Sequence, residues 1–229
     1  MYIMNEKDIK IQVFEYLLKK KEDLVIVPEV TLGSLNYMNT KGAVRADIFC
    51  VNNDISIFEI KSDRDSLTRL PKQIEMYQKY ANNVSVVIGS KFMHKIDFLS
   101  ENIGIYTYNQ KTIRCVRKPK YNTISMDIYL DYWWSKELKK VFRGVKGSHL
   151  LSLGSGQKKL SSILSEEQIK RLTLFRLKER YTHESETIKE LILNKKLAKL
   201  FPRKLFEKNI QVTALKDIPF GVINDMSIF

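Results

Sequence analysis

Hydrophobic and polar positions follow two different periods along the first half of the chain. Residues 6–21 place Ile9, Val13 and Leu17 on one face at helical spacing and end in a lysine run, which predicts a helix. Short apolar, β-branched runs then predict strands at 44–51 and 55–61. Only residues 52–54 separate these two strands, so we expect them to form a hairpin.

Further elements follow from the same patterns. The remaining elements expected in this half are a strand at 24–30 interrupted at Pro28, a turn-rich connection at 34–42, a helix at 66–81 with a kink or a late start near Leu70, strands at 84–89 and 103–109, a helix at 91–102 and an edge strand at 112–118. Strands that alternate with helices after an opening hairpin predict an α/β fold with a mixed central sheet flanked by helices.

The second half has only helical patterns. We expect this module, residues 119–229, to be all-α and separate from the α/β domain at 1–118. Its expected helices lie at 126–145, at 148–163 with a Gly/Ser break between Gly154 and Gly156, at 165–181 and at 185–201. Ser165 followed by Gln168 at the third position has the spacing of a capping box.

Composition excludes several classes of protein. Cys50 and Cys115 are the two cysteines in 229 residues, and three histidines are scattered, so neither a disulfide framework nor a zinc site of the usual spacings is expected. The apolar runs are shorter than a membrane span, and the first residues lack the layout of a signal peptide. We therefore expect a cytoplasmic protein without a membrane partner.

The charge favours a polyanionic partner. The net charge is +13, and residues 119–229 carry 21 Lys and Arg against 12 Asp and Glu, whereas residues 1–118 carry 18 against 14. An excess of this size is common in nucleic-acid-binding proteins, although many basic proteins bind none.

The hairpin carries a group of charges that suits metal chemistry. Asp47 and Glu59 are about equally far from the turn, so their side chains should come roughly opposite each other, and Lys61 shares the face of Glu59. Two neighbouring carboxylates repel each other unless a cation lies between them, and Mg²⁺ prefers such oxygen ligands. The alternative is a solvated outer face of the hairpin, but the intervening residues are apolar on both faces, which favours a covered sheet.

The same residues resemble a known nuclease superfamily. The pattern Asp47-x11-Glu59-x-Lys61 is similar to the PD-(D/E)XK motif, and the order of elements matches the core of that superfamily. The longer string EIKSDRDSLTRLPKQIEMYQKY, with Arg45-Ala46-Asp47 before it, looks like one bacterial and phage branch. The strong match covers residues 43–89, and a weaker one lies near Trp134, Glu137 and Leu138. Ala46 stands where the motif name has proline.

The resemblance implies a restriction-endonuclease-like fold and a set of roles. Asp47 and Glu59 would bind Mg²⁺ or Mn²⁺ with the Ile60 carbonyl as a further ligand, Lys61 would act on the attacking water or the phosphate, and Gln73 would support the site. Relatives often add a further acid, for which Glu15 and Glu29 are the alternatives.

Basic side chains near the motif and in the tail are candidates for binding DNA phosphates. They are Arg45, Arg64, Arg69, Lys72, Lys139, Lys140 and Arg143. Asp63 and Asp65 are expected to cap the helix that follows, and Tyr132, Trp133 and Trp134 are expected to pack inside the tail rather than stack on bases.

The expected function is therefore metal-dependent hydrolysis of DNA phosphodiester bonds, in phage–host conflict or DNA repair. The alternative is a module of the same fold that binds DNA or a protein without cutting. A homodimer and a protein partner stay open.

Overall fold

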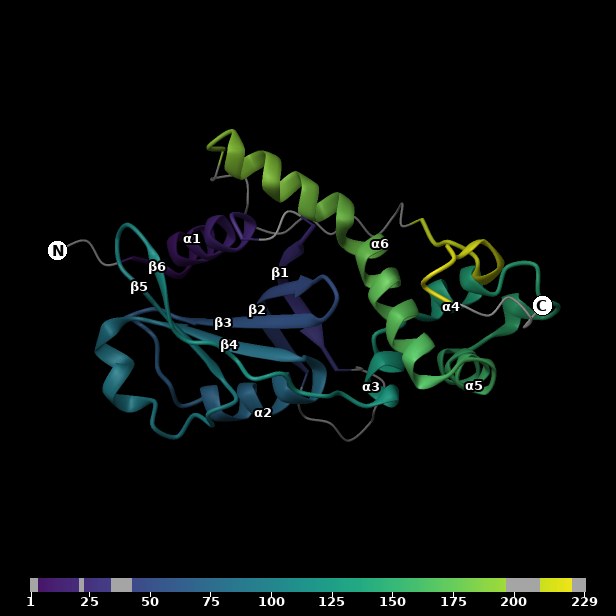
Figure 1. Cartoon of the computed structure of the whole chain (residues 1–229), viewed down its shortest axis with the longest axis horizontal. Helices are drawn as coiled ribbons and strands as arrows, with labels where there is room; N and C mark the ends of the chain where they lie inside the picture. The colour runs from purple at the N-terminus through teal and green to yellow at the C-terminus, as the bar shows by residue number, and fades with distance from the viewer. Residues whose placement is uncertain (1–3, 21–22, 34–42, 197–210, 224–229) are drawn as a thin grey trace. The chain divides into compact units, whose positions relative to one another are not determined.

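The chain folds into two compact units. The structure is a computed structural model that describes residues 4–20, 23–33, 43–196 and 211–223 (Figure 1). The first unit holds residues 1–124 and 183–205, and the second holds 125–182 and 206–229. The division thus lies six residues beyond the expected boundary at 118, and the end of the last long helix belongs with the α/β unit rather than with the tail.

A six-stranded mixed sheet forms the first unit, which confirms the expected α/β class. The strands lie in chain order: β1 (Val25–Leu32), β2 (Val44–Val51), β3 (Ile55–Lys61), β4 (Asn83–Ile88), β5 (Gly104–Tyr108) and β6 (Ile113–Arg117). β1, β2 and β3 are antiparallel, β3, β4 and β5 are parallel, and β6 is antiparallel to β5. The predicted hairpin, β2 and β3, is therefore the second half of an antiparallel meander, and β3 also begins the parallel part of the sheet.

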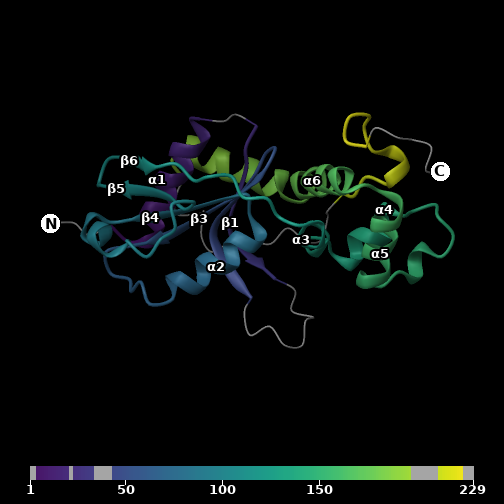
Figure 2. The same cartoon turned by 60° about the horizontal axis from the view of Figure 1, so that its bottom comes forward.

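Helices cover the sheet on both faces. α1 (Glu6–Leu18) begins at a capping box formed by Asn5 and Asp8, and α2 (Leu70–Tyr80) connects β3 to β4. The two helices lie on opposite sides of the strands (Figures 1 and 2). The apolar side chains of β2 and β3 are buried on both faces of the sheet, as expected for covered strands.

Two elements of this unit differ from their predictions. β1 runs without a break through Pro28, because β1 is an edge strand and a missing N–H costs no ladder bond there. Residues 91–102 form a short 3-10 helix, η1 (Ser90–Lys95), and then turns, since Ile96 leaves the helical region at φ −112° and ψ 13°. The late start of α2 at Leu70 is confirmed, with Pro71 in its first turn. The predicted turn-rich connection at 34–42 lies outside the described residues.

The second unit is helical, as expected, but its helices break at other places. The predicted helix at 126–145 is two helices, α3 (Met126–Asp131) and α4 (Ser135–Val141). A short 3-10 helix, η2 (Ser148–Leu150), precedes α5 (Leu153–Ile163), which continues through both glycines because Ser152 caps it ahead of them. A side chain on Gly156 would meet Leu138, so this glycine permits a close approach of α5 to α4.

One helix replaces the last two predicted helices. α6 (Glu166–Leu193) runs uninterrupted across residues 182–185, where no glycine or proline stops it, and its capping box of Ser165 and Gln168 is confirmed. Residues 197–201 of the predicted helix at 185–201 lie outside the described residues, and the described chain from 211 to 223 contains the 3-10 helix η5 (Leu215–Asp217). No helix among the described residues is long and apolar enough to cross a membrane.

A buried ion cluster organises the second unit. Glu137 of α4 is 2% exposed and accepts hydrogen bonds from Arg176 and Arg180 of α6. The Arg180 guanidinium also lies 4.1 Å from the ring centroid of Trp134. Trp133 is 2% exposed and donates its Nε1 proton to Thr173 Oγ1 at 2.9 Å. The aromatic run is therefore packed inside this unit, as predicted.

Candidate active site

Three neighbouring strands place one acid each at the same level of the sheet. The antiparallel register pairs Pro28 with Ile48 and Val30 with Ala46, so Glu29 stands at the position opposite Asp47. β2 and β3 pair Ile48 with Phe58, and Asp47 and Glu59 are the next residues on these strands. The expected approach of the two acids is thus a consequence of the hairpin register.

Glu29 has an unusual backbone for a strand residue. Its φ is +55°, a left-handed conformation that side chains other than glycine rarely adopt. The pairing of β1 with β2 omits Glu29, although the register is the same on either side. Strained residues of this kind concentrate at functional sites, where the surrounding structure holds them.

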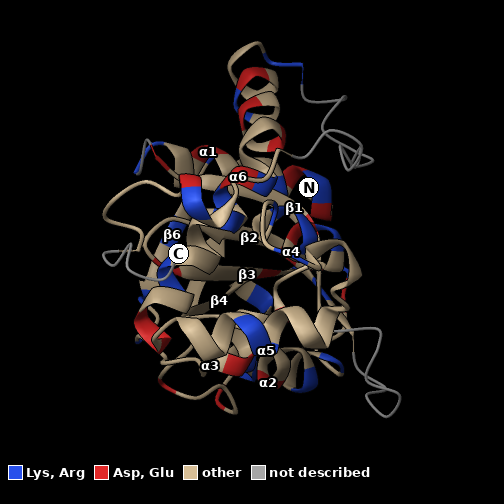
Figure 3. Cartoon of the chain, turned by 90° about the vertical axis from the view of Figure 1, so that its right-hand side faces the viewer, with Lys and Arg blue, Asp and Glu red and all other residues tan. Residues whose placement is uncertain are grey.

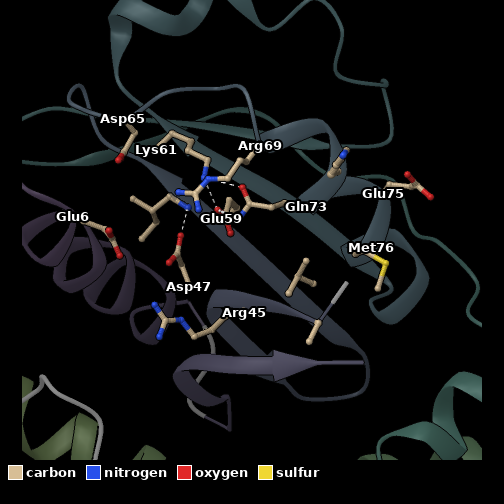
Figure 4. A pocket seen from close by; sticks show the side chains of 14 residues that line it. Glu6, Arg45, Asp47, Glu59, Lys61, Asp65, Arg69, Gln73, Glu75 and Met76 are labelled. Atoms are coloured by element: carbon tan, nitrogen blue, oxygen red, sulfur yellow. Dashed lines mark hydrogen bonds and ion pairs between the residues drawn. The ribbon is translucent and has the colours of Figure 1, made fainter. Parts of the chain in front are cut away.

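Glu59 lies in a closed hydrogen-bonded group with residues of α2. Its Oε1 accepts from Lys61 Nζ at 2.6 Å and from Gln73 Nε2 at 2.6 Å, and its Oε2 accepts from the Tyr77 hydroxyl at 2.6 Å. Lys61 Nζ also donates to Gln73 Oε1 at 2.9 Å. Glu59 and Lys61 are 2% and 7% exposed, so these charges do not belong to a solvated face of the hairpin. Gln73 and Tyr77, one helical turn apart, hold the carboxylate in place (Figure 4).

Asp47 is held from the other helix. Its Oδ2 accepts from the backbone N–H of Ile60 at 2.8 Å (Figure 4), and its Oδ1 lies 3.2 Å from Lys10 Nζ of α1. Lys10 is 3% exposed, and its ammonium also lies 2.6 Å from Glu6 Oε1 and 3.2 Å from Glu29 Oε1. One buried lysine therefore contacts three carboxylates.

The electrostatics reflect this crowding of acids. Burial, and then the charge of Glu59, raises the pKa of Asp47 to about 7, although Lys10 and the Ile60 N–H oppose the rise. Burial lowers the pKa of Lys10, but the charges of Asp47 and Glu6 more than offset it, so that this pKa is raised and the ammonium stays charged. Burial and the charge of Glu59 raise the pKa of Tyr77, which remains a hydrogen-bond donor.

A cleft of about 680 Å³ opens over these groups. Asp47, Glu59, Ile60, Lys61 and Gln73 all line it, so the structure brings together the central residues of the predicted site. Three of the predicted DNA-binding residues, Arg45, Arg69 and Lys72, line the same cleft and are exposed.

The other predicted site residues lie elsewhere. Glu15 is on α1 but is not among the residues that line the cleft. Glu29 forms an ion pair with Lys10, which also contacts Asp47. Arg64 is exposed on the loop after β3 without lining the cleft. Lys139, Lys140 and Arg143 are exposed in the second unit, where Lys and Arg are also frequent (Figure 3).

The loop after β3 is braced by its own aspartates. Asp65 Oδ2 accepts from the backbone N–H and the hydroxyl of Ser62, both at 2.7 Å. Asp63 lies against Gly89, where a Cβ atom would come 2.0 Å from the Asp63 carboxylate. The prediction that these aspartates cap α2 is wrong, since its N-cap, Arg69, has no side-chain cap and the acids instead close the loop one turn earlier.

Sequence reasoning missed Glu6, Lys10 and Tyr77. Lys10 follows Glu6 by four residues on α1, and Tyr77 follows Gln73 by four residues on α2, so the sequence shows that each pair shares a helix face but not that it lies at the site. A lysine in an amphipathic helix is usually solvated, so the burial of Lys10 depends on the acids that the sheet places beneath it.

Asp47 and Glu59 are the acids of the cleft that could together hold a divalent cation. Among the described residues, no group of three or more His, Cys, Asp or Glu is arranged to hold a metal ion. Asp47 and Glu59 nevertheless supply two carboxylates, and Asp47 Oδ1 and Glu59 Oε2 each have one partner, within the described part of the chain, of the two that a carboxylate oxygen can accept. Mg²⁺ commonly binds through one or two carboxylates and waters.

Comparisons with known proteins identify the family. Residues 2–201 match the family model described as bacteriophage P4 protein cII. Protein cII of Enterobacteria phage P4 is 27% identical over 189 residues, which cover 78% of this chain and 69% of that protein. A solved structure, the SPO1766 protein of unknown function from Silicibacter pomeroyi, overlaps 56% of this chain and 80% of its own with a TM-score of 0.41 and 15% identity. With most of its length matched by the family model, the chain belongs to the bacteriophage P4 protein cII family.

Proposed function

We propose that the chain is a metal-dependent nuclease that hydrolyses phosphodiester bonds of DNA in the cleft lined by β2, β3, α2 and Glu6 of α1. The observation that supports this most is the meeting of Asp47, Glu59, Lys61 and Gln73 in one cleft, from two strands and a helix. These residue types suit phosphoryl chemistry, in which catalysis consists of positioning and of stabilising negative charge.

Each residue has a role in the proposal. Asp47 and Glu59 would hold Mg²⁺ or Mn²⁺, with the Ile60 carbonyl as a further ligand. The ion, when bound, would polarise a phosphate oxygen and lower the pKa of a water. Lys61, 2.6 Å from Glu59, is placed to donate to the attacking water or to a phosphate oxygen. The water oxygen would attack phosphorus and give up a proton to solvent, the P–O bond to the leaving oxygen would break, and that oxygen would take up a proton.

The cleft also suits the backbone of a nucleic acid. Arg45, Arg69 and Lys72 are exposed in the lining of the cleft, together with the exposed acids Glu6, Asp65 and Glu75, and are free to approach a phosphate. Arg45 has 66% of its side chain exposed and lies 3.8 Å from Glu29, so it can exchange this weak pairing for a phosphate. Contacts of this kind position a duplex without reading its sequence.

A cleavage assay tests the proposal. Purified protein is incubated with supercoiled plasmid and with linear DNA in Mg²⁺, in Mn²⁺ and in EDTA. Wild type is expected to cut with either metal and not in EDTA, and Lys61→Met is expected to lose at least about a hundredfold in rate. Lys79→Met is the matched control, because Lys79 is an exposed lysine of α2 paired with Glu75.

The alternative is a protein of this family that binds DNA without cutting. This alternative predicts that wild type cleaves DNA in neither metal. It also predicts a DNA affinity that falls with rising salt, that EDTA does not change and that Asp47→Asn does not change. The burial of the charged Glu59 and Lys61 favours the nuclease, since a binding surface has no need of buried charges. Action in phage–host conflict or in DNA repair is part of the same proposal.

A further inference from the structure

Lys10 is a buried residue of the cluster that the proposed reaction does not use. It lies on α1, 3% exposed, with carboxylate oxygens of Glu6, Glu29 and Asp47 at 2.6, 3.2 and 3.2 Å from its Nζ. A lysine is almost never buried to this extent unless it is paired. The three acids therefore hold the ammonium of Lys10 in place, and Lys10 in turn holds the three carboxylates together.

The contacts divide the acids into two groups. Glu59 is engaged by Lys61, Gln73 and Tyr77, all on β3 or α2. Glu29 and Glu6 are engaged by Lys10 of α1. Asp47 belongs to both groups, because its Oδ1 contacts Lys10 while the charge of Glu59 acts on the same carboxylate.

We propose that Lys10 is a positioning residue: its ammonium takes the place beside Asp47 that a second metal ion would need, and limits the cleft to one ion. This inference rests on the proposed function, because it takes Asp47 and Glu59 as the ligands of the first ion. In this inference Glu29 is a partner of Lys10 and not a ligand of the metal. Glu29 has a strained backbone and stands opposite Asp47.

The charges around Lys10 explain why a neutral side chain there would admit a cation. Lys10→Met keeps the length of the side chain but removes the ammonium that contacts Glu6, Glu29 and Asp47 together, and Arg45, 3.8 Å from Glu29, is an exposed and weaker partner. Acids this close repel each other, and a divalent cation with carboxylate and water ligands relieves the repulsion. Lys10→Arg keeps the positive charge and should still exclude the ion.

Counting bound Mn²⁺ tests the inference without any need for activity. Mn²⁺ is titrated into the whole chain at pH 8, with calorimetry for affinity and paramagnetic resonance of the free ion for stoichiometry. We expect one ion per chain in wild type, in Lys10→Arg and in the control Lys79→Met, and two in Lys10→Met. One ion in folded Lys10→Met would overturn the inference and leave the proposed function intact, whereas a wild type that binds no Mn²⁺ would overturn both.

Glu29→Gln gives a second test that does not depend on how well Lys10→Met folds. If Lys10 is the partner of Glu29, then Glu29 lies next to the ligand Asp47 and does not contact the metal, so Mn²⁺ affinity should fall by no more than the about 10–100-fold that such neighbours cost when mutated. A loss well above about 100-fold would make Glu29 a ligand of the metal and overturn the inference.

Discussion

Replacement of Asp47 by asparagine should stabilise the metal-free protein at alkaline pH. The pKa of the folded-state carboxyl is raised from 3.8 to about 7, so the folded protein binds a proton that the unfolded chain releases between these values. Stability is therefore unaffected by this group below about pH 4, falls as the pH rises to 7, and stays reduced above it. The asparagine side chain of the Asp47→Asn variant carries no charge, so it removes the penalty.

The size of the effect follows from the shift. About three pH units at 1.36 kcal/mol each give an upper limit of roughly 4 kcal/mol. The pKa of about 7 already includes the opposing charge of Lys10, and the Asp47 side chain is 17% exposed, so we expect a net gain of about 2 to 4 kcal/mol in the free energy of unfolding at pH 8.

Urea unfolding of both proteins in EDTA at pH 4.5 and pH 8 measures this difference. The two should be nearly equal in stability at pH 4.5, and Asp47→Asn should be the more stable at pH 8. Saturating Mg²⁺ should then stabilise wild type but not Asp47→Asn, because only the native carboxylates bind the ion. If Asp47→Asn destabilises the protein to the same extent at both pH values, Lys10 fully offsets the cost of a charged Asp47, and crowding with Glu59 does not lower stability.

Three further variants test other parts of the structure. Gly89→Ala should cost about 2 kcal/mol of stability in thermal melts, because its Cβ would lie 2.0 Å from the Asp63 carboxylate. Asp63→Ala in the same chain should restore part of the loss. Equal stability of Gly89→Ala and wild type would contradict the packing of this loop. Glu137→Gln should cost about 3 kcal/mol in urea, since Arg180 would be left buried beside a neutral group, and a loss below about 1 kcal/mol would argue against the ion cluster. Lys72→Ala should lower the slope of log affinity for DNA against log salt by about 0.9, and an unchanged slope would remove Lys72 from the DNA-binding surface.

The part of the site that lies on the hairpin was predictable because it depends on local geometry. A two-strand register with a short turn places Asp47 near Glu59, and a spacing of two places Lys61 beside Glu59. The α/β class was predictable for the same reason, because the hydrophobic periods of short segments distinguish helices from strands.

The rest depends on contacts between distant parts of the chain. Lys10 is 37 residues from Asp47 in sequence, and no periodicity shows that α1 lays this lysine over the sheet. The continuity of α6 was missed because each of its two halves resembles a complete helix. The sequence indicates one helix only in that residues 182–185 contain no glycine or proline. The strain at Glu29 likewise has no signal in a strand-like sequence.

Addition of Mg²⁺ to a preformed complex of the protein with DNA shows directly whether the protein is a metal-dependent nuclease. Protein purified in EDTA is bound to end-labelled duplex DNA, and the DNA is followed before and after Mg²⁺ is added in excess of the chelator. We expect DNA to stay intact until Mg²⁺ is added, to be cut then by wild type, and to stay intact with Glu59→Gln and Lys61→Met, both of which still bind it. DNA that wild type binds but leaves uncut in Mg²⁺ or Mn²⁺, or that Glu59→Gln cuts at the wild-type rate, would show that the cleft is not a metal-dependent nuclease site.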